Sequence, residues 1–558
     1  MVAERPTAVL GLHELVARKR PVVSIVRVFD STGLARCISV RWPWTAIIVI
    51  VLCAFSTLIK ATKREGDCSV RQHLRARAAI SGLVVLVALS VAAKTAGASS
   101  TYDPKPWLED LEQSRAALKA KYANLEWAVF EREADLPALF ADAKARVESA
   151  SSEAEAHTAF DRLARRIGDG HVRFSWPRQS ANTPSSVQGA DCAELGYDAR
   201  MRGAAAAALV PGYTPLADPS AEEFPAGILQ AAGQRIGVVK IGLFSPKGYP
   251  DLCAAALAAL KIAPKETCDD ACADRIEAWA SKRMTQDLMA QVRALRAAGA
   301  VILLVDLVGN GGGSEWAEAA ARIVSAVRLK SNRVNFVRGE HWAAAFSKME
   351  TELRAAARDA DGQDQPLLLE LATAVAGRRR EAEIFCDSEP MWRGTRPTCQ
   401  RLGEGFFSSG LVDSADPAAL RGKSWASLVF TPVQYPFEEG VWRGHLIVLV
   451  DGATGSAAEQ FAALLQDNGV ALVMGAPTAG VGCGHTNGGT PTTLRNSHAT
   501  LELPDCVRLR KDGSNEVMGI QPDVLVGLRS QDGPHRIASR IASKLTEAVE
   551  RAMRMKQP

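Results

Sequence analysis

The stretch Val301–Gly313, VILLVDLVGNGGG, decides the fold, because an apolar run of strand length ends in a glycine-rich turn. Apolar residues without polar alternation are typical of a strand buried on both faces of a sheet. A helix is expected directly afterwards, at Glu315–Val327. The pattern recurs where the apolar run Leu446–Val450 leads through a second glycine turn to a helix at Ser456–Gln466, with another strand at Val470–Met474. Strands that alternate with helices predict an α/β core.

The flanking segments extend this pattern. We expect a strand at Ile236–Ile241, an amphipathic helix at Ala280–Ala298, and strands within Ala499–Val524. Apolar residues at helical spacing predict three helices over residues 103–166, before a short strand at His171–Trp176. Residues 341–425 interrupt the α/β pattern and are interpreted as an insertion.

The composition is that of a globular protein and argues against nucleic-acid binding. Of 558 residues, 47% are hydrophobic and 23% are charged, and the formal net charge is +4. Much of the positive excess lies before residue 80, so the remaining chain offers no basic groove for a nucleic acid.

The first hundred residues predict export. The apolar stretch Ala78–Ala93 follows several basic residues and precedes the small residues Thr95–Ser99. This arrangement is typical of a secretory signal peptide, here cleaved after Ala98, and predicts a periplasmic or secreted protein. The alternative is an uncleaved membrane anchor, which the upstream stretch Trp44–Ile59 would extend. A start of translation near Val70 would also explain the unusual position of the signal peptide.

Cysteine usage agrees with export. The chain after Ala98 contains eight cysteines, an even number that suggests disulfides in an oxidising compartment. Pairing between sequence neighbours predicts Cys268–Cys272, Cys386–Cys399 and Cys483–Cys506, which leaves Cys192–Cys253. A metal site at Cys268–Cys272 is the weaker alternative, because no second ligand pair accompanies it, and we expect neither a metal nor a cofactor.

The two glycine turns carry the candidate chemistry. Ser456 is expected in the first turn of its helix, among unpaired backbone N–H groups near the positive end of the helix dipole. Ser456 and Glu459 also have the spacing of a capping box, so a purely structural role is the alternative. The bare N–H groups of Gly311–Gly313 favour an oxyanion hole, whereas a phosphate loop would need a different glycine spacing.

Several motifs in order resemble the serine peptidase family of the C-terminal-processing (tail-specific) proteases and the tricorn core. The turn Asp306–Gly313, DLVGNGGG, is similar to that family's DLRGNGGG loop, and Leu449–Glu459 is similar to its nucleophile segment. The segments Gln466–Gly469, Gly475–Gly480 and Gly519–Asp523 match the parts that follow. The resemblance implies a crotonase/ClpP-like ββα superhelix with Ser456 as the nucleophile.

Departures from the family pattern select its tricorn-like branch, which uses histidine as the base. No lysine stands where the Ser–Lys branch requires one, but Asp169-Gly-His171 matches the histidine segment of the tricorn-like branch. The resemblance therefore implies His171 as general base and Glu516 as the carboxylate that orients it. The oxyanion donors would be Ala457 and either Gly311 or Gly312. His485 is an alternative base.

The resemblance also divides the chain and defines its expected function. The expected parts are an N-terminal extension with signal peptide or anchor (1–98), a helical domain carrying His171 (99–177), a loop-rich linker without a recognisable PDZ domain (178–234), a peptidase core (235–530) with the insertion 341–425, and a C-terminal helix (531–558). We expect an exported serine endopeptidase or carboxyl-terminal-processing protease that acts on peptides or proteins. The alternatives are a catalytically silent peptide- or lipophile-binding module on the same fold, and coenzyme-A chemistry, against which export argues.

Overall fold

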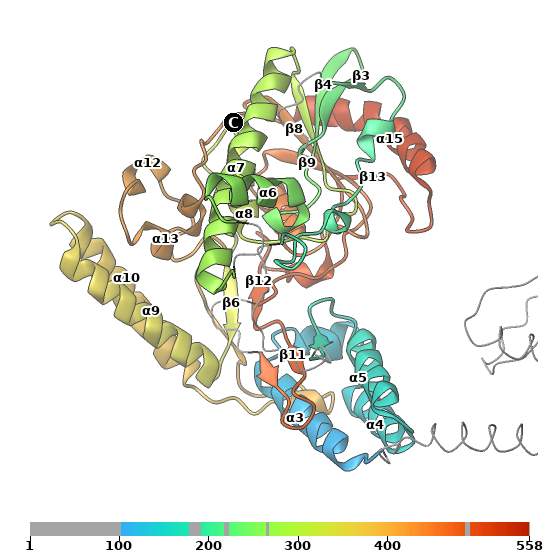
Figure 1. Cartoon of the computed structure of the whole chain (residues 1–558), viewed down its shortest axis with the longest axis vertical. Helices are drawn as coiled ribbons and strands as arrows, with labels where there is room; N and C mark the ends of the chain where they lie inside the picture. Colours follow the sequence, from blue (N-terminus) through green and yellow to red (C-terminus); the bar gives the residue numbers. More distant parts are fainter. Residues whose placement is uncertain (1–101, 178–190, 217–222, 264–266, 486–490, 557–558) are drawn as a thin grey trace, which may run out of the picture. The chain divides into compact units, whose positions relative to one another are not determined.

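The computed structural model describes residues 102–177, 191–216, 223–263, 267–485 and 491–556 (Figure 1). The predicted signal peptide and the two apolar stretches before it and within it lie outside the described residues. In the ranges that are described, none of the helices combines the length and the apolar character needed to cross a membrane.

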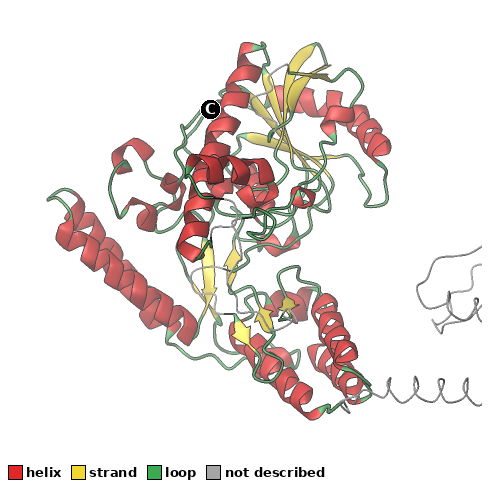
Figure 2. Cartoon of the chain, in the orientation of Figure 1, coloured by secondary structure: helices red, strands yellow, loops and turns green. Residues whose placement is uncertain are grey.

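The largest sheet of the described residues has seven strands, in the order β13-β9-β8-β5-β4-β3-β2. Figure 2 shows this sheet in the upper part of the view, with helices beside it. Neighbours from β4 to β13 pair in parallel, whereas β2 and β3 are antiparallel additions at one edge. The strand bounds are β2 Thr214–Pro215, β3 Ala226–Ala231, β4 Gln234–Lys240, β5 Ile302–Asp306, β8 His445–Val450, β9 Ala471–Gly475 and β13 Val524–Leu525. The α/β fold class is therefore confirmed, and the predicted strands at 301–307, 446–450 and 470–474 are present.

Helices cover both faces of this sheet, because alternate residues of each strand enter different hydrophobic clusters. Leu303 and Val305 of β5 pack with α7 (Asp270–Ala297), α8 (Trp316–Ile323) and α14 (Ala457–Asp467). The alternate residues Ile302 and Leu304 pack instead with the C-terminal helix α15 (Pro534–Arg554). The short helix α6 (Pro250–Ala259) precedes α7. Burial on both faces explains why these strands carry uninterrupted apolar runs.

The N-terminal helices form a separate hydrophobic cluster, which also includes residues from the C-terminal part of the chain. They are α3 (Lys105–Lys121), α4 (Leu136–Glu148) and α5 (Glu153–Ile167). Helix α5 begins at the N-cap Ser152 and ends at Gly168, whose φ of +82° suits glycine. The following strand β1 (Arg173–Ser175) pairs with β11 (Thr500–Glu502), which in turn pairs with β10 (Thr492–Thr493). This pairing holds the chain around His171 against the C-terminal part of the core.

The segment predicted as an insertion begins with a helical hairpin. Figure 1 shows α9 (Glu340–Asp359) and α10 (Asp364–Ala382) running side by side. The irregular remainder holds the short helices α11 (Glu389–Trp392), α12 (Pro417–Leu420) and α13 (Ala426–Val429). A second small sheet, which was not predicted, has β6 (Val334–Val337) between β12 (Cys506–Arg508) and β7 (Leu402–Gly403). Its strands are too short to show a periodic pattern.

The remaining elements are short turns of helix: Trp127–Glu131, Ala199–Met201, Ala207–Leu209, Pro246–Gly248, Thr431–Gln434 and Glu516–Met518. The eight cysteines form the four predicted pairs, Cys192–Cys253, Cys268–Cys272, Cys386–Cys399 and Cys483–Cys506. The last pair ties the loop after β9 to strand β12.

A buried ion pair fixes the end of β5, where the first glycine turn begins. The Lys240 ammonium lies 3.4 Å from an Asp306 carboxylate oxygen and donates to the Val308 carbonyl at 2.6 Å. Asp306 also accepts the Val308 and Ala207 backbone N–H groups. Burial lowers the pKa of Lys240, and the charge of Asp306 opposes that shift. The pair thus sets the direction in which the chain leaves the strand.

We predict that Lys240→Met destabilises the protein by about 3–5 kcal/mol, because it leaves the Asp306 carboxylate buried without its cation. Urea unfolding at pH 7 measures this free energy. The matched control is Lys144→Met in α4, which removes an exposed ion pair with Glu148 and should cost less than about 1 kcal/mol. Equal losses in the two variants would contradict a special role of the buried pair.

Candidate active site

The turn between β8 and α14 presents Ser456 in a backbone conformation that is rare for its residue type. Its φ is +53° and its ψ is −120°, so the chain bends sharply from strand to helix at this residue. Such a conformation costs free energy and persists only where the surroundings hold it. The Ser456 Oγ lies 3.2 Å from the Nε2 atom of His171, which comes from the segment after α5.

The contacts of His171 define its protonation. The Nδ1 atom lies 3.0 Å from the carbonyl oxygen of Val481. A carbonyl oxygen only accepts hydrogen bonds, so Nδ1 carries the proton and Nε2 presents its lone pair to Ser456. Burial lowers the pKa of His171 to about 4, and the positive charges of Arg508 and Arg173 act in the same direction. The ring is therefore a neutral acceptor near pH 7.

Asp169 anchors the histidine segment. One of its carboxylate oxygens accepts the His171 backbone N–H at 2.9 Å. The other accepts the Tyr122 hydroxyl at 3.1 Å and the Asn124 side-chain amide at 2.9 Å. Burial raises the pKa of Asp169, and these donors oppose the shift. Asp169 thus ties the base to the helical segment that carries it.

The two glycine turns are bonded to each other. An Asp451 carboxylate oxygen accepts the Gly309 N–H at 2.9 Å, and the Thr454 hydroxyl donates to the Leu307 carbonyl at 3.0 Å. The Gly455 N–H donates to the Asn310 carbonyl at 3.0 Å. The glycine-rich loop therefore has a fixed position beside the nucleophile turn.

The expected oxyanion donors differ in their availability. The Gly312 N–H donates to the Asn310 side chain at 2.9 Å. The N–H groups of Gly311 and Ala457 have no acceptor among the described residues. A Cβ atom at Gly312 would lie only 2.7 Å from the Ser456 Cβ and 3.0 Å from the Ala457 nitrogen. Gly312 thus permits close approach of the loop, and Gly311 and Ala457 are the available donors.

Glu516 differs from its expected role as the orienter of His171. Its fully buried carboxylate is bound by the Arg508 guanidinium, with distances of 2.6 Å to Nε and 2.7 Å to Nη2. A two-pronged arginine contact of this kind satisfies both carboxylate oxygens. The Val481 carbonyl takes the position at Nδ1 instead. This carbonyl could not be predicted from the sequence, because its direction depends on the conformation of a loop.

Glu459 combines the expected capping contact with others that the sequence did not predict. Its carboxylate accepts the Ser456 backbone N–H, as in a capping box, but it also binds the loop around Val481. The Ser456 hydroxyl faces His171. The sequence signals for this residue were the capping spacing and its place at the end of the nucleophile segment Leu449–Glu459.

The alternative base His485 lies close to the site but pairs elsewhere. The centre of its ring is 6.0 Å from that of His171, and its Nε2 lies 3.6 Å from a Glu502 carboxylate oxygen. Cys483 is part of a disulfide and has no thiol to react. The described residues contain no group of three or more His, Cys, Asp or Glu side chains placed to hold a metal ion.

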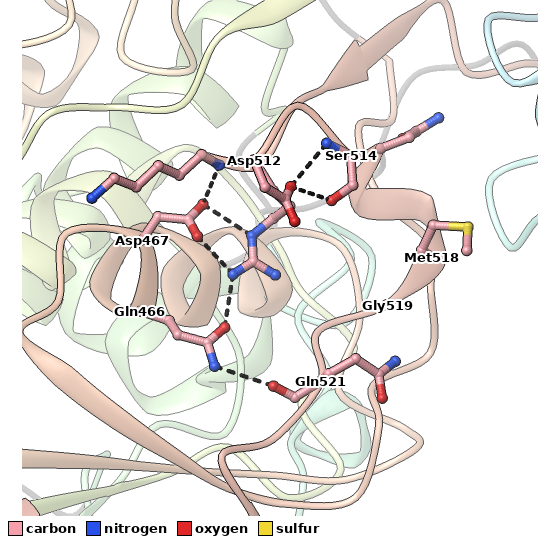
Figure 3. Close-up of a pocket in the computed structure, with 10 residues that line it drawn as sticks. Gln466, Asp467, Asp512, Ser514, Met518, Gly519 and Gln521 are labelled. Atoms are coloured by element: carbon pink, nitrogen blue, oxygen red, sulfur yellow. Dashed lines mark hydrogen bonds and ion pairs between the residues drawn. The ribbon is translucent and has the colours of Figure 1, made fainter.

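The described part of the chain has two cavities near its C-terminal segments, and Ser456 lines neither of them. The larger, about 550 Å³, is lined by the end of α14 and by residues 510–521 (Figure 3). Arg510 and Asp467 line this cavity and form an ion pair with a separation of 2.8 Å. The smaller cavity, about 290 Å³, is lined partly by Gly168 and Gly480.

Comparisons with known proteins found similarity to peptidases. Residues 275–526 match the model of peptidase family S41, which supports a serine peptidase. A comparison with curated proteins found no match. Among solved structures, mature CPAF is 14% identical, with a TM-score of 0.50 over 81% of this chain and 98% of its own. The photosystem II D1 C-terminal processing protease is 15% identical, with a TM-score of 0.30 over 79% of this chain and 98% of its own. The tricorn protease is 12% identical, with a TM-score of 0.30 over 81% of this chain and 37% of its own.

We predict that Gly484→Ala slows the reaction of Ser456 with a fluorophosphonate probe by about tenfold or more. The added Cβ would lie 2.9 Å from the His171 Nε2 and would displace the ring. Gly452→Ala is the control, since its Cβ would have no neighbour closer than 3.9 Å and its turn leads to Ser456. Similar rates for both variants would contradict the observed placement of the ring.

We also predict that the His171 ring titrates near pH 4, well below an exposed histidine, because burial disfavours its charged form. NMR titration of the ring protons measures this, with His171→Ala used to assign the resonance. A midpoint near 6.5 would mean that the ring is exposed to solvent in the free protein.

Proposed function

We propose that this chain, whose residues 275–526 match peptidase family S41, is an exported serine peptidase that forms an acyl-enzyme on Ser456. The observation that carries the proposal is the 3.2 Å contact between the Ser456 Oγ and the lone pair of a neutral His171. Serine is unreactive at its own pKa and needs an adjacent base of this kind.

In the acylation step, the Ser456 Oγ attacks the carbonyl carbon of the substrate peptide bond while His171 Nε2 takes the hydroxyl proton. The carbonyl oxygen becomes an oxyanion, which accepts hydrogen bonds from the Ala457 and Gly311 N–H groups. The C–N bond then breaks, and His171 returns the proton to the leaving amine. The acyl group remains as an ester on Ser456.

In the deacylation step, water attacks the ester carbon and His171 accepts one proton of the water. The second tetrahedral intermediate collapses, the bond to the Ser456 Oγ breaks, and His171 returns the proton to that oxygen. The product is a free carboxyl terminus. Substrates are peptides or proteins, in keeping with a peptidase core.

Export is supported by the four disulfides within the described residues, since disulfides form and persist in oxidising compartments. The signal peptide proposed to end at Ala98 would direct the chain to the periplasm or outside the cell. The alternative is a membrane anchor in the same region. Sequencing the N-terminus of the native protein distinguishes a cleaved from an uncleaved chain.

We predict that Ser456→Ala and His171→Ala each lower peptide hydrolysis by about a thousandfold or more, because nucleophile and base act as one unit. Hydrolysis of a broad peptide library and labelling by a fluorophosphonate measure this. His485→Ala should retain activity within about threefold, since its ring lies beside Glu502 and makes no hydrogen bond to Ser456 among the described residues.

Other outcomes would each exclude part of the proposal. Loss of activity in His485→Ala, with His171→Ala active, would move the base to His485. A wild-type protein that neither cleaves the library nor reacts with the probe would favour the catalytically silent binding module.

A further inference from the structure

We propose that Glu459 is a positioning residue. It holds the nucleophile Ser456 and the Val481 carbonyl, which orients His171, in one hydrogen-bonded ring. The inference rests on the proposed peptidase function and adds to it a residue whose contacts extend well beyond a helix cap. Glu459 is fully buried at the start of α14. Its carboxylate touches neither the reacting hydroxyl nor the imidazole, so its effect passes through backbone groups.

One carboxylate oxygen of Glu459 serves both catalytic segments. It accepts the Ser456 N–H at 2.9 Å, the Val481 N–H at 3.0 Å and the Gly482 N–H at 3.2 Å. The Ser456 bond helps to hold the residue at its positive φ, a conformation that needs support from its surroundings. The other two bonds fix the loop after β9.

The second carboxylate oxygen binds the same loop from its other end. It accepts the Gly480 N–H at 2.7 Å and the Thr478 hydroxyl at 2.5 Å. The Thr478 oxygen in turn accepts the Ile520 N–H at 2.7 Å. Five donors therefore converge on Glu459, and only a carboxylate, which has no donor of its own when ionised, accepts all of them.

These bonds close a ring through the catalytic pair. Glu459 binds the Val481 N–H, and the Val481 carbonyl receives the proton on His171 Nδ1. His171 Nε2 meets the Ser456 Oγ, and the Ser456 N–H returns to Glu459. A shift of the loop would therefore turn the imidazole away from the hydroxyl, and small displacements of this kind are costly to catalysis.

The other links to the loop do not reach Val481. The Ala479 N–H donates to the Thr454 carbonyl at 2.9 Å, and the Thr478 N–H donates to the Ile520 carbonyl at 3.2 Å. Arg508 reaches the Gly482 carbonyl at 3.4 Å, while its shorter bonds go to Glu516. The disulfide Cys483–Cys506 ties the loop beyond Val481. Glu459 alone contacts the backbone of both Ser456 and Val481 among the described residues, which distinguishes its role from general support of the fold.

The test is Glu459→Gln, assayed for peptide hydrolysis and for the rate of fluorophosphonate labelling. Glutamine has the same shape, but its NH2 group donates hydrogen bonds and cannot accept them. At least one of the five donors around residue 459 would therefore lose its acceptor. We expect kcat and the labelling rate to fall by about tenfold to a hundredfold, with KM within about twofold of wild type. A loss confined to kcat is the signature of a misplaced catalytic pair.

The matched control is Asp467→Asn, at the other end of the same helix. Asp467 is a partly buried acceptor, bound by Arg510, by the Asn332 side chain and by the Lys511 N–H, and Figure 3 shows it directed into the larger cavity. It contacts neither Ser456 nor the loop 478–482. We expect a lower melting temperature for this variant, with kcat within about twofold of wild type.

The outcomes separate the inference from the function beneath it. An active wild type with Glu459→Gln of equal kcat would overturn the inference and leave the peptidase proposal intact. Equal losses of kcat in Glu459→Gln and Asp467→Asn would also overturn it, since the cause would be general destabilisation. A wild type inert to peptides and probe would overturn both. If Glu459→Gln does not fold, Thr478→Val removes one of the five donors, and an unchanged kcat there would overturn the inference.

Discussion

The parallel register of β5 and β8 is the constraint on which the candidate site depends. Asp306 pairs with Leu449, so the carboxyl ends of both strands lie next to each other. The glycine turns that follow the two strands are therefore neighbours. Because side chains alternate along a strand, a slip of one residue would exchange the two faces of the core. The register would then no longer allow the bonds from Gly309 to Asp451 and from Gly455 to Asn310. The oxyanion loop and the nucleophile turn are thus positioned by the packing of the sheet.

His171 comes from the N-terminal hydrophobic cluster, whereas Ser456 belongs to the sheet. The position of His171 therefore depends on how these two parts pack together. Strand β1 pairs with β11, and the Asn515 side-chain amide donates to that of Asn124 at 2.9 Å, beside the anchor Asp169. Leu501 and Val517 of the C-terminal part pack into the cluster of the N-terminal helices. His171 therefore meets Ser456 only when two parts of the chain, 285 residues apart, are both folded and joined.

The sequence predicted what depends on local pattern and missed what depends on loop direction. Apolar runs of strand length and glycine turns located β5, β8 and Ser456, because burial and chain reversal leave a direct mark on composition. His171 followed from the resemblance and not from periodicity. The contact of Glu516 with Arg508 was not predicted, since Arg508 lies in a three-residue strand with no periodic signal. The role of the Val481 carbonyl could not be predicted from the sequence, because every residue has a carbonyl and only the fold decides where it points.

In the proposed reaction, the protein holds His171 in place but does not make its ring more basic. Burial lowers the pKa of the ring to about 4, and a carboxylate at Nδ1 would oppose that shift. The buried carboxylates Glu459 and Glu516 instead bind backbone N–H groups and Arg508. The ring consequently stays neutral, with its lone pair on Ser456, over the range in which an exposed histidine would titrate. The charge that it gains during catalysis is balanced chiefly by the oxyanion of the intermediate, so this stabilisation exists only while the substrate reacts.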